Sequence, residues 1–260
     1  MVRIKIESTV ITHVGLVRKK NEDNYFINGR SKSDNTVTAE GFVDNKLRDT
    51  YLFGVFDGMG GENSGEIASM IAAKTLTEYM STDFRYTITD YVQRANKYIC
   101  DEIMRNKGVR IGTTIAMLYF RDNKVVAYNM GDSRVYLLRK EDLYLMTEDH
   151  TEAQRLVKIG AMDEETAKHH KSRNKLTQHL GIFPNELVIE PYISKELKLK
   201  KNDIFLVCSD GLSDMVSDDD IRDIMARTDL DTPGIAKELS ATAQENGGKD
   251  NTTVIVIKVV

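Results

Sequence analysis

The feature of the sequence that most constrains the fold is a run of short apolar segments between Thr113 and Met146. The segments TTIAMLYF, KVVAYNM, RVYLLR and LYLM follow one another closely, and Asp122-Asn123 forms the first turn between them. Strands joined by such short turns pair antiparallel, because a parallel pair needs a crossover of a dozen or more residues. We therefore expect an antiparallel meander in this part of the chain.

The rest of the 260-residue chain adds more strands and separate groups of helices. Alternation of apolar and polar residues predicts an opening strand, and apolar runs predict buried ones. These strands are expected over Arg3 to Val14, Tyr51 to Phe56, Ile204 to Cys208 and Thr253 to Val260. Apolar residues at helical spacing predict helices over Ser64 to Met80 and about Thr87 to Asn106. Strands grouped apart from helices indicate an α+β fold with antiparallel sheets.

One polar segment, Asp149 to Gln178, interrupts this pattern and is predicted to be an inserted surface subdomain. A short helix is expected within it, around Glu152 to Ile159. The segment also carries a basic tract without an intervening acid, consisting of Lys168, Lys171, Arg173 and Lys175. The tract would either steer phosphopeptides or form a solvated loop, and the solvated loop is the favoured interpretation.

Composition excludes several classes of protein. With 41% hydrophobic and 29% charged residues, the chain is not predominantly disordered. A net charge of −4 with both signs interspersed does not favour nucleic acid as a partner. The longest apolar runs are of strand length and the N-terminus lacks the apolar block of a signal peptide, so no membrane association is expected. Cys100 and Cys208 show no metal or redox spacing, which suits a reducing cytoplasm.

The stretch FDGMGGENSGE places a single carboxylate, Asp57, at the end of an apolar strand and then several glycines. It would form either a loop that cradles phosphate or a site where the backbone approaches a metal ion. A P-loop needs a lysine after its last glycine, whereas Gly65 is followed by Glu66. A dinucleotide loop needs a glycine where Asn63 stands. The metal site is therefore favoured.

Further acids occupy comparable positions. Asp210 follows an apolar strand and precedes a glycine, Asp250 precedes the final strand, and Asp132 follows another apolar strand. In an antiparallel sheet the end of one strand and the start of its neighbour share an edge, so these acids would converge with Asp57. Gathered carboxylates need cations, and hard oxygen ligands select Mg²⁺ or Mn²⁺. Gly58 would offer its own carbonyl to such an ion.

The segment GLVRKKNEDNY carries a second cluster of chemical groups. Arg18 precedes Glu22 and Asp23 by a short polar turn. The planar guanidinium of arginine matches two phosphate oxygens. Taken alone, however, the cluster would be interpreted as a surface turn with an incidental ion pair.

Together these segments resemble the metal-dependent protein phosphatases of type 2C, the PPM family, in their compact bacterial form. The resemblance rests on GLVRKKNEDNY, FGVFDGMGGENSGE, the GTT at 112–114, NMGDSRVYLL, LTQHLG, FLVCSDGLSD and GGKDNTTVIVI, which occur in the family's order over nearly the whole chain. It implies a β-sandwich of two antiparallel sheets flanked by helix pairs, in four αββα layers. It also implies a single catalytic domain over 1–260, with a small flap insert at about 149–178.

The resemblance further implies roles for individual residues. Asp57 would bridge two Mn²⁺ or Mg²⁺ ions with the Gly58 carbonyl beside it, and Asp210 and Asp250 would bind the first ion. Asp132 and Asp214 would bind a third, weaker ion. Arg18 would bind phosphate, Glu22 would contact metal-bound water, and Asp23 would orient the attacking water.

The function implied is a serine/threonine protein phosphatase that hydrolyses phosphoserine and phosphothreonine by attack of a metal-bridging hydroxide. Its partners would be phosphorylated proteins, including those of a bacterial Ser/Thr kinase that it opposes, and we expect a cytoplasmic monomer. Two alternatives are a phosphatase dedicated to one regulatory switch protein and a catalytically weak or dead relative that only binds phosphoproteins.

One position departs from the family. Many eukaryotic relatives have a histidine after the DG pair, proposed to protonate the leaving alkoxide, whereas this chain has Met59. The general acid is thus unassigned, and a metal-bound water is the hypothesis. The five histidines of the chain are expected to be mainly surface or packing residues.

Overall fold

The computed structural model describes residues 5–32, 39–60 and 64–260, and its strands form two large antiparallel sheets and one small one. The first sheet has the order β11-β10-β14-β15-β1-β4. Its strands are β1 (Ile6–His13), β4 (Ala39–Asp44), β10 (Arg134–Arg139), β11 (Asp142–Leu145), β14 (Ile204–Cys208) and β15 (Thr252–Val259). The predicted residues Arg3 and Ile4 of the opening strand lie outside the described residues.

The second sheet has the order β12-β9-β8-β5-β2-β3, and β13 also pairs with β9. Its strands are β2 (Asn24–Ile27), β3 (Arg30–Ser31), β5 (Thr50–Phe56), β8 (Ile115–Arg121), β9 (Lys124–Met130), β12 (Tyr192–Ile193) and β13 (Leu197–Lys198). The small sheet pairs β6 (Gly58–Gly60) with β7 (Ile111–Thr113).

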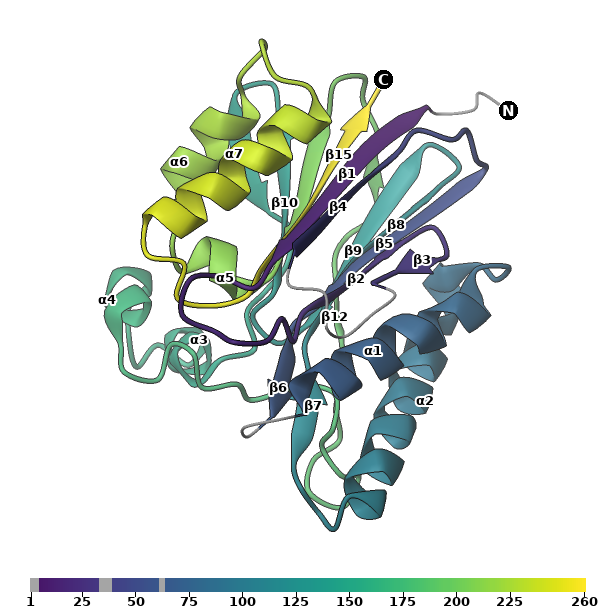
Figure 1. Ribbon diagram of the computed structural model, residues 1–260, viewed down its shortest axis with the longest axis vertical. Helices are drawn as coiled ribbons and strands as arrows, with labels where there is room; N and C mark the ends of the chain where they lie inside the picture. Colours follow the sequence, from purple (N-terminus) through teal and green to yellow (C-terminus); the bar gives the residue numbers. More distant parts are fainter. Residues whose placement is uncertain (1–4, 33–38, 61–63) are drawn as a thin grey trace.

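Helices cover the outer face of each large sheet, which gives four layers (Figure 1). On the second sheet lie α1 (Gly65–Leu76), the 3₁₀ turn η1 (Thr77–Tyr79) and α2 (Phe84–Arg105). On the first sheet lie α5 (Asp210–Ser213), α6 (Asp218–Met225) and α7 (Thr232–Glu245). The predicted α+β sandwich is therefore confirmed.

The alternation of side chains along each strand explains the layers. In β14, Phe205 and Val207 pack in the core between the two sheets, whereas Ile204, Leu206 and Cys208 pack beneath α6 and α7. Every residue of this strand is buried, which is why it reads as one continuous apolar run.

The predicted meander over Thr113 to Met146 is wrong as a single sheet. Two hairpins occur instead: β8 and β9 pair in the second sheet, and β10 and β11 pair in the first. Asp122 and Asn123 form the expected turn, both with positive φ. The chain changes sheets at Gly131, whose φ of +106° would strain any other residue.

The helix predicted from Thr87 begins at Phe84 instead, because the Asp83 carboxylate accepts a hydrogen bond from the Arg85 N–H and so caps the helix. In the polar segment 149–178 the predicted helix is present as α3 (Glu152–Lys158). A second helix, α4 (Glu164–His169), follows it.

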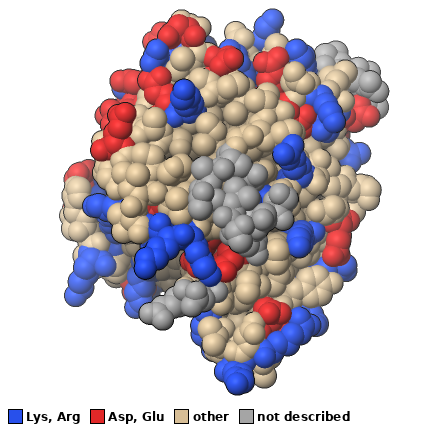
Figure 2. Space-filling model, viewed as in Figure 1, with Lys and Arg blue, Asp and Glu red and all other residues tan. Residues whose placement is uncertain are grey.

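Positive and negative side chains are interspersed over the face shown in Figure 2, as they are along the sequence. Of the helices in the described ranges, none has the length and apolar character needed to cross a membrane.

Candidate active site

Seven of the nine predicted site residues line one cleft of about 550 Å³. They are Arg18, Glu22, Asp57, Gly58, Asp132, Asp210 and Asp250. They come from both large sheets and from the loops that leave them, so segments far apart in the sequence meet here. The two predicted residues that do not line this cleft are Asp23 and Asp214.

Asp57 lies between β5 and β6, and both its backbone N–H and its backbone carbonyl make hydrogen bonds. Its N–H donates to Thr114 Oγ1 at 3.0 Å, and its carbonyl accepts from the Thr114 N–H at 2.9 Å. Burial raises the pKa of Asp57 well above its ordinary value, and the charges of Asp210 and Asp23 raise it further. The ionised carboxylate is therefore disfavoured unless a cation is near.

Asp210 and Asp250 meet at one edge of the first sheet, as the strand-end argument predicted. Asp210 follows β14 and Asp250 precedes β15, and these two strands are antiparallel neighbours. Burial raises the pKa of Asp210 to about 7, although a hydrogen bond with Asp57 acts in the opposite direction. Among buried side-chain atoms, Asp210 Oδ1 has no hydrogen-bond partner. An oxygen of this kind is ready to bind a cation.

Gly58 is placed so closely that no side chain fits. A Cβ atom there would lie 2.4 Å from the Gly65 carbonyl oxygen and 2.5 Å from that of Glu22. This packing requires a glycine here, whereas the approach of its carbonyl to a metal ion stays a prediction.

Arg18 reaches the cleft from the loop between β1 and β2. Its Nη2 lies 2.5 Å from Asp250 Oδ2, while 54% of the side chain remains exposed. Glu22 accepts a hydrogen bond from the Gly65 N–H at 3.3 Å, and burial raises its pKa. An exposed guanidinium beside buried acids is suited to an anionic ligand.

Asp23 has no exposed surface and lies behind the cleft. Its Oδ2 accepts hydrogen bonds from Ser209 Oγ at 2.8 Å and Thr253 Oγ1 at 2.7 Å, whereas its buried Oδ1 has no partner. Burial raises its pKa to about 6, opposed by these two hydrogen bonds and by the charge of Lys32. Its predicted role in orienting water stays a prediction.

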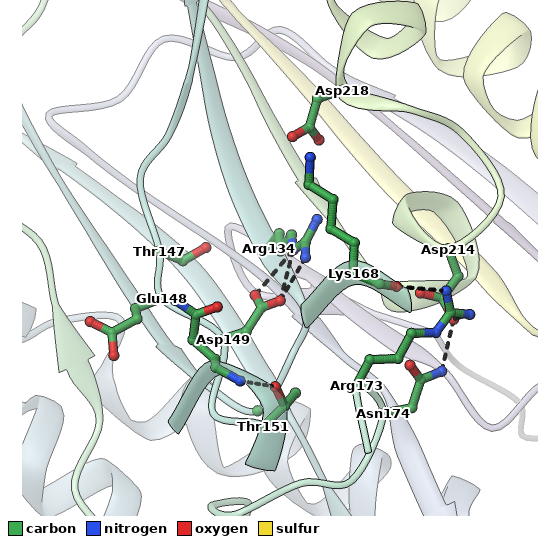
Figure 3. A network of polar contacts seen from close by, with 12 residues as sticks. Arg134, Thr147, Glu148, Asp149, Thr151, Lys168, Arg173, Asn174, Asp214 and Asp218 are labelled. Carbon is green, nitrogen blue, oxygen red and sulfur yellow. Dashed lines mark hydrogen bonds and ion pairs between the residues drawn. The ribbon is translucent and has the colours of Figure 1, made fainter. Parts of the chain in front are cut away.

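Asp132 and Asp214 lie towards a neighbouring cavity of about 660 Å³, which Asp210 also lines. Figure 3 shows Asp214 next to two residues of the 149–178 segment. Its Oδ2 accepts from Arg173 at 3.2 Å and from Asn174 at 2.8 Å. The favoured interpretation of the basic tract as merely solvated is thus incomplete, because Arg173 is paired. Burial and the charge of Asp210 raise the pKa of Asp132 well above its ordinary value.

Two residues that support the site were missed from the sequence. The Asn251 side chain donates to the Val14 and Lys20 carbonyls, each at 2.8 Å, and accepts from the Glu22 N–H at 2.7 Å. The Lys32 ammonium, on a side chain only 2% exposed, donates to the carbonyls of Asn21 and Asp23. Their partners are distant in the sequence or are backbone atoms, so no local pattern indicated them.

A third missed feature is the wall formed by the chain that returns from the 149–178 segment. Lys175, Leu176 and His179 all line the cleft beside Asp57. The motif LTQHLG contains the last of these, but its histidine was expected to be a packing or surface residue.

The donor set suits divalent cations. It consists of carboxylate and carbonyl oxygens, which favour Mg²⁺ or Mn²⁺, and one of them, the buried Asp210 Oδ1, has no hydrogen-bond partner. Within residues 5–32, 39–60 and 64–260, no three His, Cys, Asp or Glu side chains already surround one point as a finished ligand set. The acids line one cleft without already forming a complete ligand set in the part of the chain that the structure describes.

Comparison with known proteins decides the family. The family model described as Protein phosphatase 2C matches residues 9–252. The chain belongs to the protein phosphatase 2C family. The resemblance identified from the motifs is confirmed, and so, at the level of the family, is the prediction of a metal-dependent protein phosphatase.

Bacterial members of the protein phosphatase 2C family match nearly the whole chain. Protein phosphatase PhpP of Streptococcus pneumoniae is 29% identical over 264 residues, covering 98% of each chain. The serine/threonine phosphatase stp of Listeria monocytogenes is 29% identical over 259 residues, covering 95% of this chain and 93% of its own.

Solved structures of this family share the fold. The serine/threonine phosphatase PstP of Mycobacterium tuberculosis superposes with a TM-score of 0.81 at 28% identity, covering 98% of both chains. The catalytic domain of PstP in complex with two manganese ions gives a TM-score of 0.80 at 28% identity, covering 99% of both chains.

Proposed function

We propose that this protein hydrolyses phosphoserine and phosphothreonine on phosphorylated proteins. The observation that carries the proposal is the meeting of Asp57, Asp210 and Asp250 with the exposed guanidinium of Arg18 in one cleft. Named relatives that match nearly the whole chain are serine/threonine phosphatases, which supports this substrate class.

Asp57, the Gly58 carbonyl, Asp210 and Asp250 would hold two Mn²⁺ or Mg²⁺ ions, and Asp132 with Asp214 a third, weaker one. When bound, such ions lower the pKa of water and offset the charge of the phosphate. The related structure with two manganese ions supports the number of ions.

The protein groups have separate tasks. Arg18 would bind phosphate oxygens, and its ion pair with Asp250 holds the guanidinium at the cleft. Glu22, fixed by Asn251 and Gly65, would accept hydrogen bonds from water near the phosphate. Asp23 would act from behind the cleft, through Ser209 and Thr253, on the orientation of that water.

The chain would act as one catalytic domain over 1–260, with residues 149–178 as its flap. It would work as a monomer in the cytoplasm and oppose a Ser/Thr kinase. Cys100 and Cys208 are both free and buried, which suits a reducing compartment.

The test is turnover of phosphoserine and phosphothreonine peptides with Mn²⁺, with and without chelator. We expect turnover that chelator abolishes and that added Mn²⁺ restores. Binding of phosphopeptides without turnover in Mn²⁺ would contradict the proposal and favour a binding module. Turnover of one phosphoprotein but of no other would favour a phosphatase dedicated to a single regulatory protein.

A further inference from the structure

His179 lines the cleft, and one strand, β7, lies between its segment and the predicted metal ligand Gly58. Gly58 pairs with Thr113 between β6 and β7. Thr113 in turn exchanges two backbone hydrogen bonds with Leu180, at 3.1 Å and 2.9 Å. The residue before Leu180 is thereby fixed at the wall of the cleft that Asp57 and Arg18 also line.

The ring of His179 packs directly against Gly112, the residue paired with Met59. A Cβ atom on Gly112 would lie 2.7 Å from His179 Nδ1, so the ring occupies the space above this glycine. Met59 is the residue after the Asp57-Gly58 pair and has no proton to donate. The histidine therefore lies next to the position where the chain lacks one.

The hydrogen bond of the ring assigns its tautomer. Nδ1 lies 2.8 Å from the Leu180 carbonyl oxygen, and since a carbonyl only accepts, Nδ1 carries a proton. Nε2 is then the nitrogen that gains and loses a proton. Burial lowers the pKa of His179, so a smaller fraction of the ring is protonated at neutral pH, but the imidazolium is a stronger acid than an exposed one. Of the histidines in the described chain, His179 is the one that lines this cleft.

We propose that His179 is the general acid for the leaving alcohol, in place of the water expected from the sequence; this rests on the proposed phosphatase activity. The oxygen of water forms a bond to phosphorus and gives its proton to solvent as the bond from phosphorus to the serine oxygen breaks. The serine oxygen leaves with the bonding electron pair and takes the proton from Nε2. Neutral His179 then regains a proton from solvent.

The test compares leaving groups in a variant that keeps the Nδ1 hydrogen bond. In His179→Asn the side-chain amide replaces Nδ1 as donor to Leu180, and only Nε2 is lost. Removal of a general acid costs about 100- to 10,000-fold for a poor leaving group. We expect kcat on a phosphoserine peptide to fall by at least about 100-fold. We expect kcat on 4-nitrophenyl phosphate, whose phenolate leaves without a proton, to be unchanged.

The matched control is His169→Gln, which removes an exposed histidine of α4 and should change neither rate. Equal losses on both substrates in His179→Asn, with or without a lower melting temperature, would show a structural role and overturn the proposal. No loss on either substrate would also overturn it. If wild type with Mn²⁺ turned over neither substrate, the proposed function itself would have failed.

Discussion

At the scale of single residues, the cleft concentrates carboxylates that repel one another. Burial raises the pKa values of Asp57, Asp132 and Asp210, and each of these acids is raised further by a neighbouring acid. Without cations, the fold therefore carries an unfavourable electrostatic contribution at neutral pH. The same acids supply the ligands that cations need, so stability and cation binding oppose each other at these positions.

Asp210→Asn should reveal this opposition. The folded-state pKa of about 7 lies above the unfolded value of about 3.9, so folding takes up a proton between these values. Without metal ions, the protonated Asp210 therefore stabilises the wild type fully below about pH 4. This stabilisation is lost as the pH rises towards 7. Asp210→Asn does not titrate, so its advantage in free energy of unfolding should grow over this range by roughly 3 kcal/mol.

Urea unfolding with chelator at pH 4.5 and 7.5 measures this difference, and Asp142→Asn, at an exposed acid of β11, is the control. In Mn²⁺ the Asp210→Asn variant should lose turnover by about 100-fold or more. An equal difference in stability at both pH values would contradict the electrostatic explanation.

At the scale of elements, one side chain fastens the loop that carries Arg18 and Glu22. Asn251, at the entry to β15, makes three hydrogen bonds to this loop, to Val14, Lys20 and Glu22. These hydrogen bonds fix the loop relative to β15, a central strand of the first sheet. The geometry of the loop is set by a contact between residues more than 200 positions apart.

Asn251→Ala should lower the free energy of unfolding by about 1–3 kcal/mol, because buried backbone groups lose their partners. It should also raise KM for phosphopeptides, because Arg18 is no longer held. Thermal melting and steady-state kinetics measure the two effects. Asn246→Ala, which removes one exposed hydrogen bond to Met215, is the matched control and should leave KM unchanged. An unchanged KM in Asn251→Ala would contradict this role.

The 149–178 segment is fastened at its base and at one further point. At the base, the Glu152 backbone N–H donates to the Lys175 carbonyl, and the Thr177 backbone N–H donates to the His150 carbonyl. Further out, Arg173 and Asn174 donate to Asp214 (Figure 3). The second attachment uses exposed groups and is the weaker one.

Arg173→Ala should therefore loosen the segment without weakening the fold. We expect faster amide hydrogen exchange over residues 160–175, unchanged exchange in β5 and an unchanged melting temperature. Lys171→Ala, at an exposed residue of the same tract, should leave exchange as in wild type. Unchanged exchange in Arg173→Ala would mean that the base alone fixes the segment.

The sequence predicted individual elements better than their arrangement. The strand ending at Phe56 and the one starting near Thr253 were predicted because alternation and apolar runs are local signals. The break at Gly131 was missed because such patterns show which side of a strand is buried but not which sheet the strand joins. For the site, the acids at strand ends were visible, whereas Lys32 and His179 depend on tertiary packing.

At the scale of the whole molecule, the sandwich creates the site by bringing the ends of its two sheets together. Asp57 follows a strand of the second sheet, and Asp210 and Asp250 lie next to the ends of β14 and β15 in the first. Three apolar cores, between the sheets and under each helix layer, fix the sheets relative to each other. The acids therefore converge because the cores are packed, despite their mutual repulsion.

Anomalous scattering from crystals grown with Mn²⁺ tests the central claim most directly. We predict two strong anomalous peaks in the cleft, bounded by Asp57, the Gly58 carbonyl, Asp210 and Asp250, and a weaker one near Asp132 and Asp214. Crystals of Asp57→Asn should lose the two strong peaks. A wild-type cleft without anomalous density in saturating Mn²⁺, or density only at sites away from these acids, would contradict the account.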